Sequence, residues 1–139
     1  MRLVCIGKAG VDLYRTLSDS ETSRHILRFY RPKEMPWGVT LEVATVSSGL
    51  ALASELRWYI MRYMAEVLFE DTEHAVYLTR DLAREVYETR SAALIDGWNI
   101  AFSVIVLKDG TSARMPDGVP LPDGIVQTFR VWGLGREHP

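Results

Sequence analysis

The longest hydrophobic stretch of the chain runs from Ser47 to Glu70, and its polar residues recur on one stripe at helical spacing. Ser47 and Ser48 can accept hydrogen bonds from the free N–H groups of a first helical turn. Residues 50–70 contain neither glycine nor proline, which favours an uninterrupted helix. The pattern therefore predicts one long helix that is covered by other elements on most of its sides.

The same stretch is long enough to span a membrane, but its charges argue against that. Glu55, Arg57, Arg62 and Glu66 would all lie in the hydrocarbon, where each central charge costs about 2.5 to 3.5 kcal/mol. We therefore expect no membrane partner. The polar stripe is expected to face water or a partner protein.

Short runs rich in β-branched and aromatic residues, bounded by turn residues, predict the strands. Asp109-Gly110 is a strong hairpin signal, and Pro32 ends another run. The expected strands are Leu3–Ile6, His25–Arg31, Gly38–Val46, Trp98–Leu107, Thr111–Arg114 and Ile125–Trp132. Residues 32–37 are expected to form a hairpin connection.

Three segments are less regular. Residues 71–90 show helical spacing and are interpreted as one helix beside the first, although a strand over 74–78 followed by a helix capped by Thr79 fits almost as well. Residues 11–17 fit a short strand or a single turn, and residues 18–23 fit a polar loop.

These elements predict an α+β fold. The expected architecture is a largely antiparallel sheet wrapped around one long central helix, with the second helix alongside. At 139 residues the chain is expected to form a single domain, 1–139, with residues 132–139 as a mobile tail.

Composition and charge suit a cytoplasmic protein that binds other proteins. The chain has a single cysteine, Cys5, so no internal disulfide forms, and it shows no signal peptide. The net charge of −2 differs from the strongly basic character that is usual for broad nucleic-acid binding. Thirteen of the 16 basic residues are arginine, a composition that a GC-rich coding sequence would also explain.

No motif for catalysis, a cofactor or a metal rises above background. Gly7-Lys8-Ala9-Gly10 lacks the full phosphate-loop spacing and predicts a turn. The three histidines are not at metal-ligand spacing. We therefore predict a non-enzymatic protein without catalytic residues, cofactor or metal. The alternative is a ligand-binding protein or enzyme with a pocket between sheet and central helix near Glu55, Tyr59 and Glu66.

Nucleic-acid binding is a further alternative because four basic residues surround Phe29 and Tyr30, namely Arg24, Arg28, Arg31 and Lys33. Strand alternation would send the two aromatic rings to opposite faces, so that at most one could stack beside a given set of charges. We expect no direct nucleic-acid binding from this segment.

The candidate functional residues are instead those typical of protein interfaces. Tryptophan, methionine and arginine are enriched at binding hot spots, and several of them lie on loops or near a chain end where complete burial is difficult. The predicted protein-binding residues are Arg28, Arg31, Met35, Trp37, Arg130 and Trp132.

A short, arginine-rich, single-cysteine α+β chain without motifs resembles the small proteins of phages of thermophilic bacteria. Among these it is similar to the inhibitors that bind the β-subunit flap of the host RNA polymerase and the nearby sigma-factor region. The resemblance implies a regulator of transcription that acts in the host cytoplasm by occupying a protein surface. It assigns no role to any residue of this chain.

Overall fold

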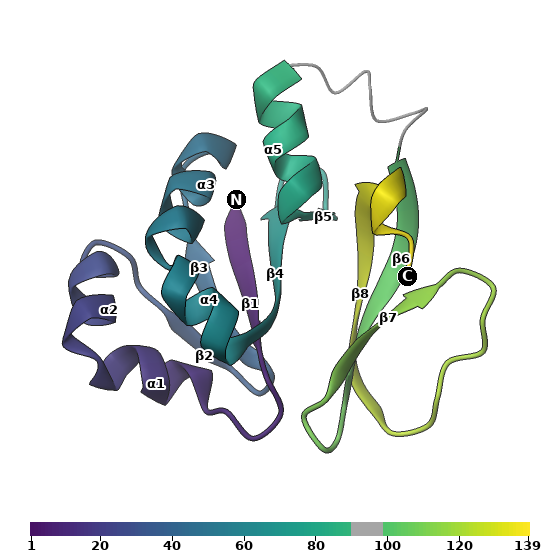
Figure 1. The fold of residues 1–139 in the computed structure, drawn as a ribbon, viewed down its shortest axis with the longest axis horizontal. Helices are drawn as coiled ribbons and strands as arrows, with labels where there is room; N and C mark the ends of the chain where they lie inside the picture. The colour runs from purple at the N-terminus through teal and green to yellow at the C-terminus, as the bar shows by residue number, and fades with distance from the viewer. Residues whose placement is uncertain (90–98) are drawn as a thin grey trace.

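The computed structural model describes residues 1–89 and 99–139, and within them the chain forms eight strands and five short helices (Figure 1). The strands are β1 Arg2–Gly7, β2 Lys33–Met35, β3 Gly38–Glu42, β4 Met64–Asp71, β5 Val76–Thr79, β6 Asn99–Leu107, β7 Ser112–Pro116 and β8 Ile125–Leu134. The helices are α1 Leu13–Asp19, α2 Glu21–Ile26, α3 Val46–Glu55, α4 Arg57–Tyr63 and α5 Arg80–Thr89, and a short 3-10 turn, η2, spans Gly135–Glu137.

All eight strands belong to one sheet in the order β2-β3-β1-β4-β5-β8-β6-β7. Neighbouring strands are antiparallel except β5 and β8, which are parallel and share only the pairs Tyr77↔Val131 and Leu78↔Trp132. This short pairing joins two parts of the sheet, β1–β5 and β6–β8. The two parts can therefore turn toward each other.

The protein has three layers, because each face of the β1–β5 part is covered by a different element type. The helices cover one face, and the β6–β8 part lies on the other side (Figure 1). Strand β1 shows how the sequence does this: Leu3 and Cys5 face the helices, whereas Val4 and Ile6 contact Phe102 and other residues of β6 and β8. A strand buried on both faces needs a continuous apolar run.

The prediction of one long central helix over residues 47–70 is wrong, and with it the predicted fold class. The segment divides into α3, α4 and strand β4. The described residues form a mixed α/β fold, in which five short helices accompany one large eight-stranded sheet. In β4, Val67 and Phe69 face the helices while Leu68 faces β6 and β8. Apolar residues on both faces of a strand give the same sequence signal as a helix buried on most sides.

The single helix expected over residues 71–90 is also wrong, and the alternative considered for this segment is the correct one. Strand β5 is followed by α5, and the Thr79 hydroxyl accepts a hydrogen bond from the Leu82 N–H at 3.1 Å. Arg90, the expected end of that helix, lies outside the described residues.

Residues 11–31, which contain the first two helices, were predicted as a short strand or turn, a loop and a strand. Residues 11–17 and 18–23 instead contribute to α1 and α2, and residues 25–31 form the end of α2 and a turn. Asp12 and Ser20 cap the two helices by accepting hydrogen bonds from Arg15 N and Ser23 N. Side-chain caps allow helices of only seven and six residues to form where no long periodic pattern exists.

The other expected strands are confirmed as β1, β3, β6, β7 and β8, although Trp98, the expected start of β6, lies outside the described residues. Their ends shift by one or two residues, except that β3 stops at Glu42 and the expected end Val46 begins α3. The expected hairpin connection contains β2, which pairs with β3. The segment expected as a tail, 132–139, contains the end of β8 and η2, and the Glu137 side chain is only 9% exposed. Its mobility and the single-domain organisation stay predictions.

Cys5 provides a test of the core. It is 1% exposed in the central strand β1, and burial raises the pKa of its thiol to about 12. Because the thiolate is the reactive form, the folded protein is expected to react with a thiol reagent such as DTNB at pH 8 only as fast as it unfolds. Labelling should be immediate in guanidinium chloride. Stoichiometric labelling within minutes, without loss of circular dichroism, would contradict this burial.

Candidate functional site

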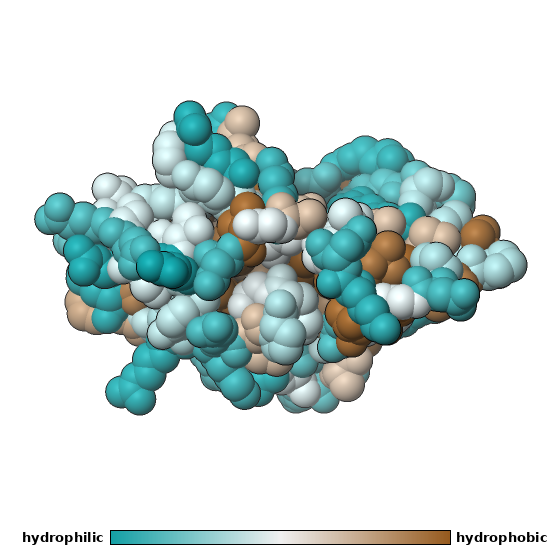
Figure 2. Space-filling view, turned by 90° about the horizontal axis from the view of Figure 1, so that it is seen from below, coloured by the Kyte–Doolittle hydropathy of each residue, from teal (hydrophilic) through white to brown (hydrophobic). Residues whose placement is uncertain are grey.

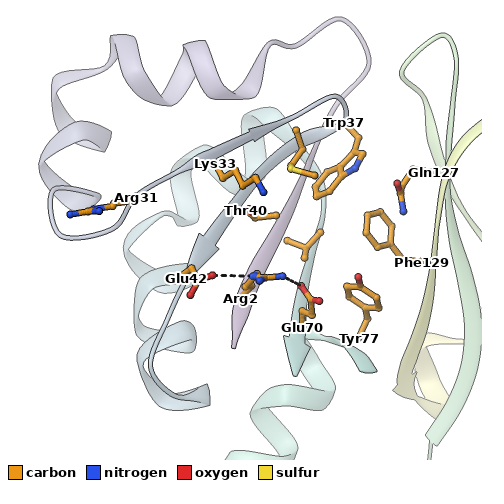
Figure 3. Close-up of a pocket in the computed structure, with 12 residues that line it drawn as sticks. Arg2, Arg31, Lys33, Trp37, Thr40, Glu42, Glu70, Tyr77, Gln127 and Phe129 are labelled. Atoms are coloured by element: carbon orange, nitrogen blue, oxygen red, sulfur yellow. Dashed lines mark hydrogen bonds and ion pairs between the residues drawn. The ribbon is translucent and has the colours of Figure 1, made fainter. Parts of the chain in front are cut away.

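A groove lies where the β2-β3-β1 side of the sheet faces β8 (Figure 3). Its volume is about 400 Å³, which lies within the usual range for ligand sites. This sheet groove is lined by Arg2, Val4, Arg31, Lys33, Met35, Trp37, Thr40, Glu42, Glu70, Tyr77, Gln127 and Phe129. The lining therefore combines residues from five strands, β1, β2, β3, β4 and β5, with two from β8 and with Arg31 and Trp37 from the loops around β2.

Three aromatic rings form one wall of the sheet groove. Phe129 is 2% exposed, and its ring stands edge-on to Trp37 at 5.1 Å and to Tyr77 at 5.2 Å between ring centroids. The backbone also holds Trp37, because its carbonyl accepts a hydrogen bond from Gly7 N at 3.0 Å. Edge-to-face packing fixes the wall before any partner binds, which lowers the entropic cost of binding.

The centre of the sheet groove holds an ion-pair network. The Arg2 guanidinium contacts Glu42 at 3.1 Å and Glu70 at 3.4 Å, and Figure 3 shows it between the two carboxylates. The hydrogen bond to Glu42 and the charge of Glu70 raise the pKa of Arg2 above its usual value. Partial burial raises the pKa of the Tyr77 hydroxyl, so it stays protonated at neutral pH and can donate a hydrogen bond.

Two cations of the sheet groove, Lys33 and Arg31, remain available for a partner, and Lys33 is the more central of them. Its side chain points toward the middle of the sheet groove, whereas Arg31 lies at the outer rim, away from the aromatic wall (Figure 3). Neither residue forms an ion pair with any residue in the described part of the chain. Arg2 already engages both groove carboxylates, which leaves the sheet groove with one cation in excess.

The six predicted protein-binding residues fall into separate places. Arg31, Met35 and Trp37 all line the sheet groove. Arg28 follows α2, where its guanidinium lies 4.6 Å from the Phe29 ring centroid and donates to the His25 carbonyl.

Arg130 and Trp132 lie on the other side of β8 from Phe129, because successive strand residues alternate between faces. The Arg130 guanidinium forms two hydrogen bonds to Asp117, at 2.6 and 2.8 Å, and Trp132 is 36% exposed. One partner surface is therefore unable to contact all six residues.

The other groove residues were missed because they are far apart in sequence. Arg2, Tyr77 and Phe129 come from β1, β5 and β8, and only the sheet order brings them together. The one local signal is the alternation of polar Gln127 and aromatic Phe129 with outward-facing residues along β8.

The two alternative sites inferred from the sequence are arranged differently from expectation. The Glu55, Tyr59 and Glu66 stripe is divided, since Glu66 lies in β4 and pairs with Arg114 of β7. Arg24 and Arg28 lie in α2 and the turn after it, so the expected strand His25–Arg31, which was to carry the two aromatic residues, does not form.

Single exposed hydrophobic residues occur elsewhere. Seen from below, they appear mainly on the β6–β8 side and are separated by hydrophilic residues (Figure 2). Those exposed in that part of the chain include Val119, Leu121 and Val126. Isolated residues of this kind are ordinary on protein surfaces.

Two further observations concern residues 1–89 and 99–139. No group of three or more His, Cys, Asp or Glu side chains there is placed to hold a metal ion. Every helix in this part of the chain is too short or too polar to cross a membrane.

Comparison with known proteins gives one match. No curated protein and no solved structure is significantly similar to the chain. Nothing found bears on inhibitors of RNA polymerase, so that resemblance stays a prediction. Residues 1–97 match the DUF5804 family model, a range that includes most of the sheet groove but not Gln127 and Phe129. The chain therefore belongs to DUF5804, a family of unknown function.

Proposed function

We propose that this protein is a non-enzymatic regulator that binds an acidic segment of another protein in the sheet groove. The observation that carries this proposal is Lys33, a cation without a carboxylate partner in the described chain, which points into a groove beside Met35 and Trp37. A carboxylate of the partner would pair with Lys33. Arg31 at the rim would attract a second one.

The hydrophobic residues of the sheet groove support a partner segment that also carries an apolar side chain. Trp37 and Met35 are partly exposed, and Phe129 supports the Trp37 ring from the side. An apolar side chain inserted here would remove these surfaces from water without rearranging the groove. Tryptophan and arginine are also the residues that dominate binding energy at interfaces.

Charge supports an acidic rather than a basic partner. The whole chain carries a net charge of −2, whereas the groove has three cations and two carboxylates. A local positive field on an acidic protein favours the approach of an anionic segment in the correct orientation. Its effect falls as salt is added.

The partner protein is a separate part of the proposal. The resemblance described above makes the β flap and sigma region of bacterial RNA polymerase the first surface to test. The sheet groove does not depend on that identity, because the argument for an acidic segment rests on Lys33, Arg31 and their neighbours.

The double charge reversal Lys33→Glu with Arg31→Glu tests the proposal. We expect it to weaken partner binding at least about tenfold, because both cations would become carboxylates facing the partner's acids. The wild-type and variant proteins would be compared in quantitative pull-downs from bacterial lysate and against purified RNA polymerase holoenzyme. Arg28→Glu is the control for a single charge reversal in the same region, because Arg28 lies outside the groove; it is compared with Lys33→Glu and Arg31→Glu made singly.

A second pair of variants locates the surface. Trp37→Ala is expected to weaken binding, whereas Trp132→Ala on the other side of β8 is expected to have little effect. Equal retention of partners by the groove variants and the wild type would contradict the proposal. Binding to another protein but not to the polymerase would reject only the partner.

A further inference from the structure

A second hollow lies among the helices that cover the β1–β5 part of the sheet. It has a volume of about 710 Å³ and lies between α1–α2 and the junction of α3 with α4. This helix hollow is lined by Thr16, Asp19, Ser20, Thr22, Ile26, Glu55, Trp58, Tyr59 and Tyr63. Three of these residues are aromatic, two are acidic and none is basic.

The aromatic residues of the helix hollow form a cluster that is ordered on one side and open on the other. Tyr59 is 5% exposed, and its hydroxyl lies 2.6 Å from the Ser20 Oγ. The Trp58 ring centroid lies 4.9 Å from that of Tyr59 and 5.9 Å from that of Tyr63. Trp58 itself is 52% exposed, a large aromatic surface left in contact with water.

The same ring already attracts a cation. The Arg62 guanidinium lies 4.4 Å from the Trp58 ring centroid, within the range of a cation–π interaction. The electron-rich faces of tryptophan and tyrosine favour cations over neutral groups of the same shape.

The carboxylates of the helix hollow are available to a ligand. Glu55 forms no ion pair with any residue between 1 and 89 or between 99 and 139, and Asp19 has only an exposed pair with Arg15 at 3.5 Å. Exposed pairs of this kind contribute little, so Asp19 can exchange its partner at small cost.

From the joint presence of an aromatic cluster, two carboxylates and no basic residue in the lining, we infer that the helix hollow binds an alkylammonium group. The group would place its cationic head against Trp58 and Tyr63 and near Glu55, and its alkyl part against Ile26. It belongs either to a free amine or to a lysine side chain of a partner protein. This site is independent of the sheet groove and of the function proposed for it.

Choline tests the inference, and 3,3-dimethylbutan-1-ol is its neutral equivalent of nearly the same shape. Each would be titrated into ¹⁵N-labelled protein, with sodium chloride added to keep ionic strength constant. We expect choline to shift the indole N–H resonance of Trp58 and the amide of Tyr59 with a millimolar dissociation constant. The neutral alcohol should shift them much less.

Two variants separate the contributions of the Trp58 ring and the Glu55 carboxylate to choline binding. Trp58→Leu keeps an apolar side chain at an exposed position but removes the ring, and it is expected to weaken choline binding about five- to tenfold. Glu55→Gln should weaken binding several-fold and reduce its salt dependence. Trp37→Leu in the sheet groove is the control and should leave choline binding unchanged.

A Gly-Ser peptide with one trimethyllysine distinguishes the two sources of the cation. Tighter binding of the peptide than of choline would identify a partner side chain, and the reverse would identify a free amine. The inference is overturned if choline shifts no resonance of the helix hollow at concentrations up to about 50 mM, well above a millimolar dissociation constant. It is also overturned if the neutral alcohol shifts these resonances equally.

Discussion

Gly38→Ala is expected to lower the free energy of unfolding by about 3 kcal/mol or more, because the added methyl group would clash with the backbone of β1. Gly38 begins β3 and pairs with Ile6 of β1 and Met35 of β2. A Cβ atom at this position would lie 1.9 Å from the Cys5 carbonyl oxygen. Because that oxygen belongs to the backbone of a buried strand, it has no room to move aside, and β1 and β3 must separate.

Gly118→Ala is the matched control. Gly118 has a φ of +80°, and a Cβ atom there would have no atom within 4 Å. Alanine at Gly118 would therefore strain only the backbone, at a cost of about 1 to 2 kcal/mol. Urea unfolding followed by circular dichroism compares the two variants. Equal stability would show that β1 and β3 are not in the contact described.

The substitution Gly38→Ala also links the fold to the sheet groove. Trp37 immediately precedes Gly38, and its carbonyl accepts the hydrogen bond from Gly7 N. Displacing β3 would move Trp37 away from Phe129, with a change in tryptophan fluorescence and in near-ultraviolet circular dichroism. Partner binding should therefore fall in any fraction of Gly38→Ala that still folds.

The strands that could be predicted from the sequence have local signals at both ends. Residues 3–6 form an apolar run that stops at a glycine, and the end of β6 is marked by Asp109-Gly110. In such cases hydrophobic pattern and turn chemistry agree. Strand register and the pairing of β5 with β8 have no local signal, because they depend on contacts between distant residues.

Residues 47–70 show why pattern alone misassigned the centre of the chain. Helix α3 ends at Glu55 and α4 ends at Tyr63, and no glycine or proline marks either point. In β4 the neighbours Leu68 and Phe69 are both fully buried, on opposite faces of the sheet. A run buried on two faces loses the alternation that identifies a strand, and a helical interpretation then fits the same letters.

The sheet groove was predictable only in the segment around β2. Met35 lies between Pro32 and Pro36 and Trp37 directly follows Pro36, in a short connection where complete burial is difficult, and this signal predicts both as interface residues. Arg31 is predicted because arginine is enriched at interfaces. Lys33 lies in the same segment but is not among the interface residues predicted from the sequence. Its role depends on Arg2, which engages both nearby carboxylates from another strand.

Arg114→Ala is expected to lower the free energy of unfolding by about 2 to 3 kcal/mol, because it leaves two mostly buried carboxylates without their cation. The Arg114 guanidinium pairs with Glu66 of β4 and lies 3.4 Å from Glu137 of η2. The two carboxylates are 13% and 9% exposed. The expected loss of stability is smaller than for a fully buried ion pair because Arg114 is itself 31% exposed and partly screened by water.

The effect of Arg114→Ala should extend beyond one ion pair. Glu137 also accepts hydrogen bonds from the Thr79 hydroxyl at 2.7 Å and from Leu134 N at 2.9 Å, and Thr79 caps α5. Loss of the cation would favour solvation of Glu137 over these hydrogen bonds. The C-terminal turn and the start of α5 should then exchange amide hydrogens faster than in the wild type.

Arg130→Ala provides the comparison, since Arg130 also forms a two-contact pair with a carboxylate but does so at the surface. The side chains of Arg130 and Asp117 are 57% and 48% exposed, so the loss should be under about 1 kcal/mol. If both variants lose the same stability at pH 7, the network around Glu137 does not hold β7 and the C-terminal turn against β4.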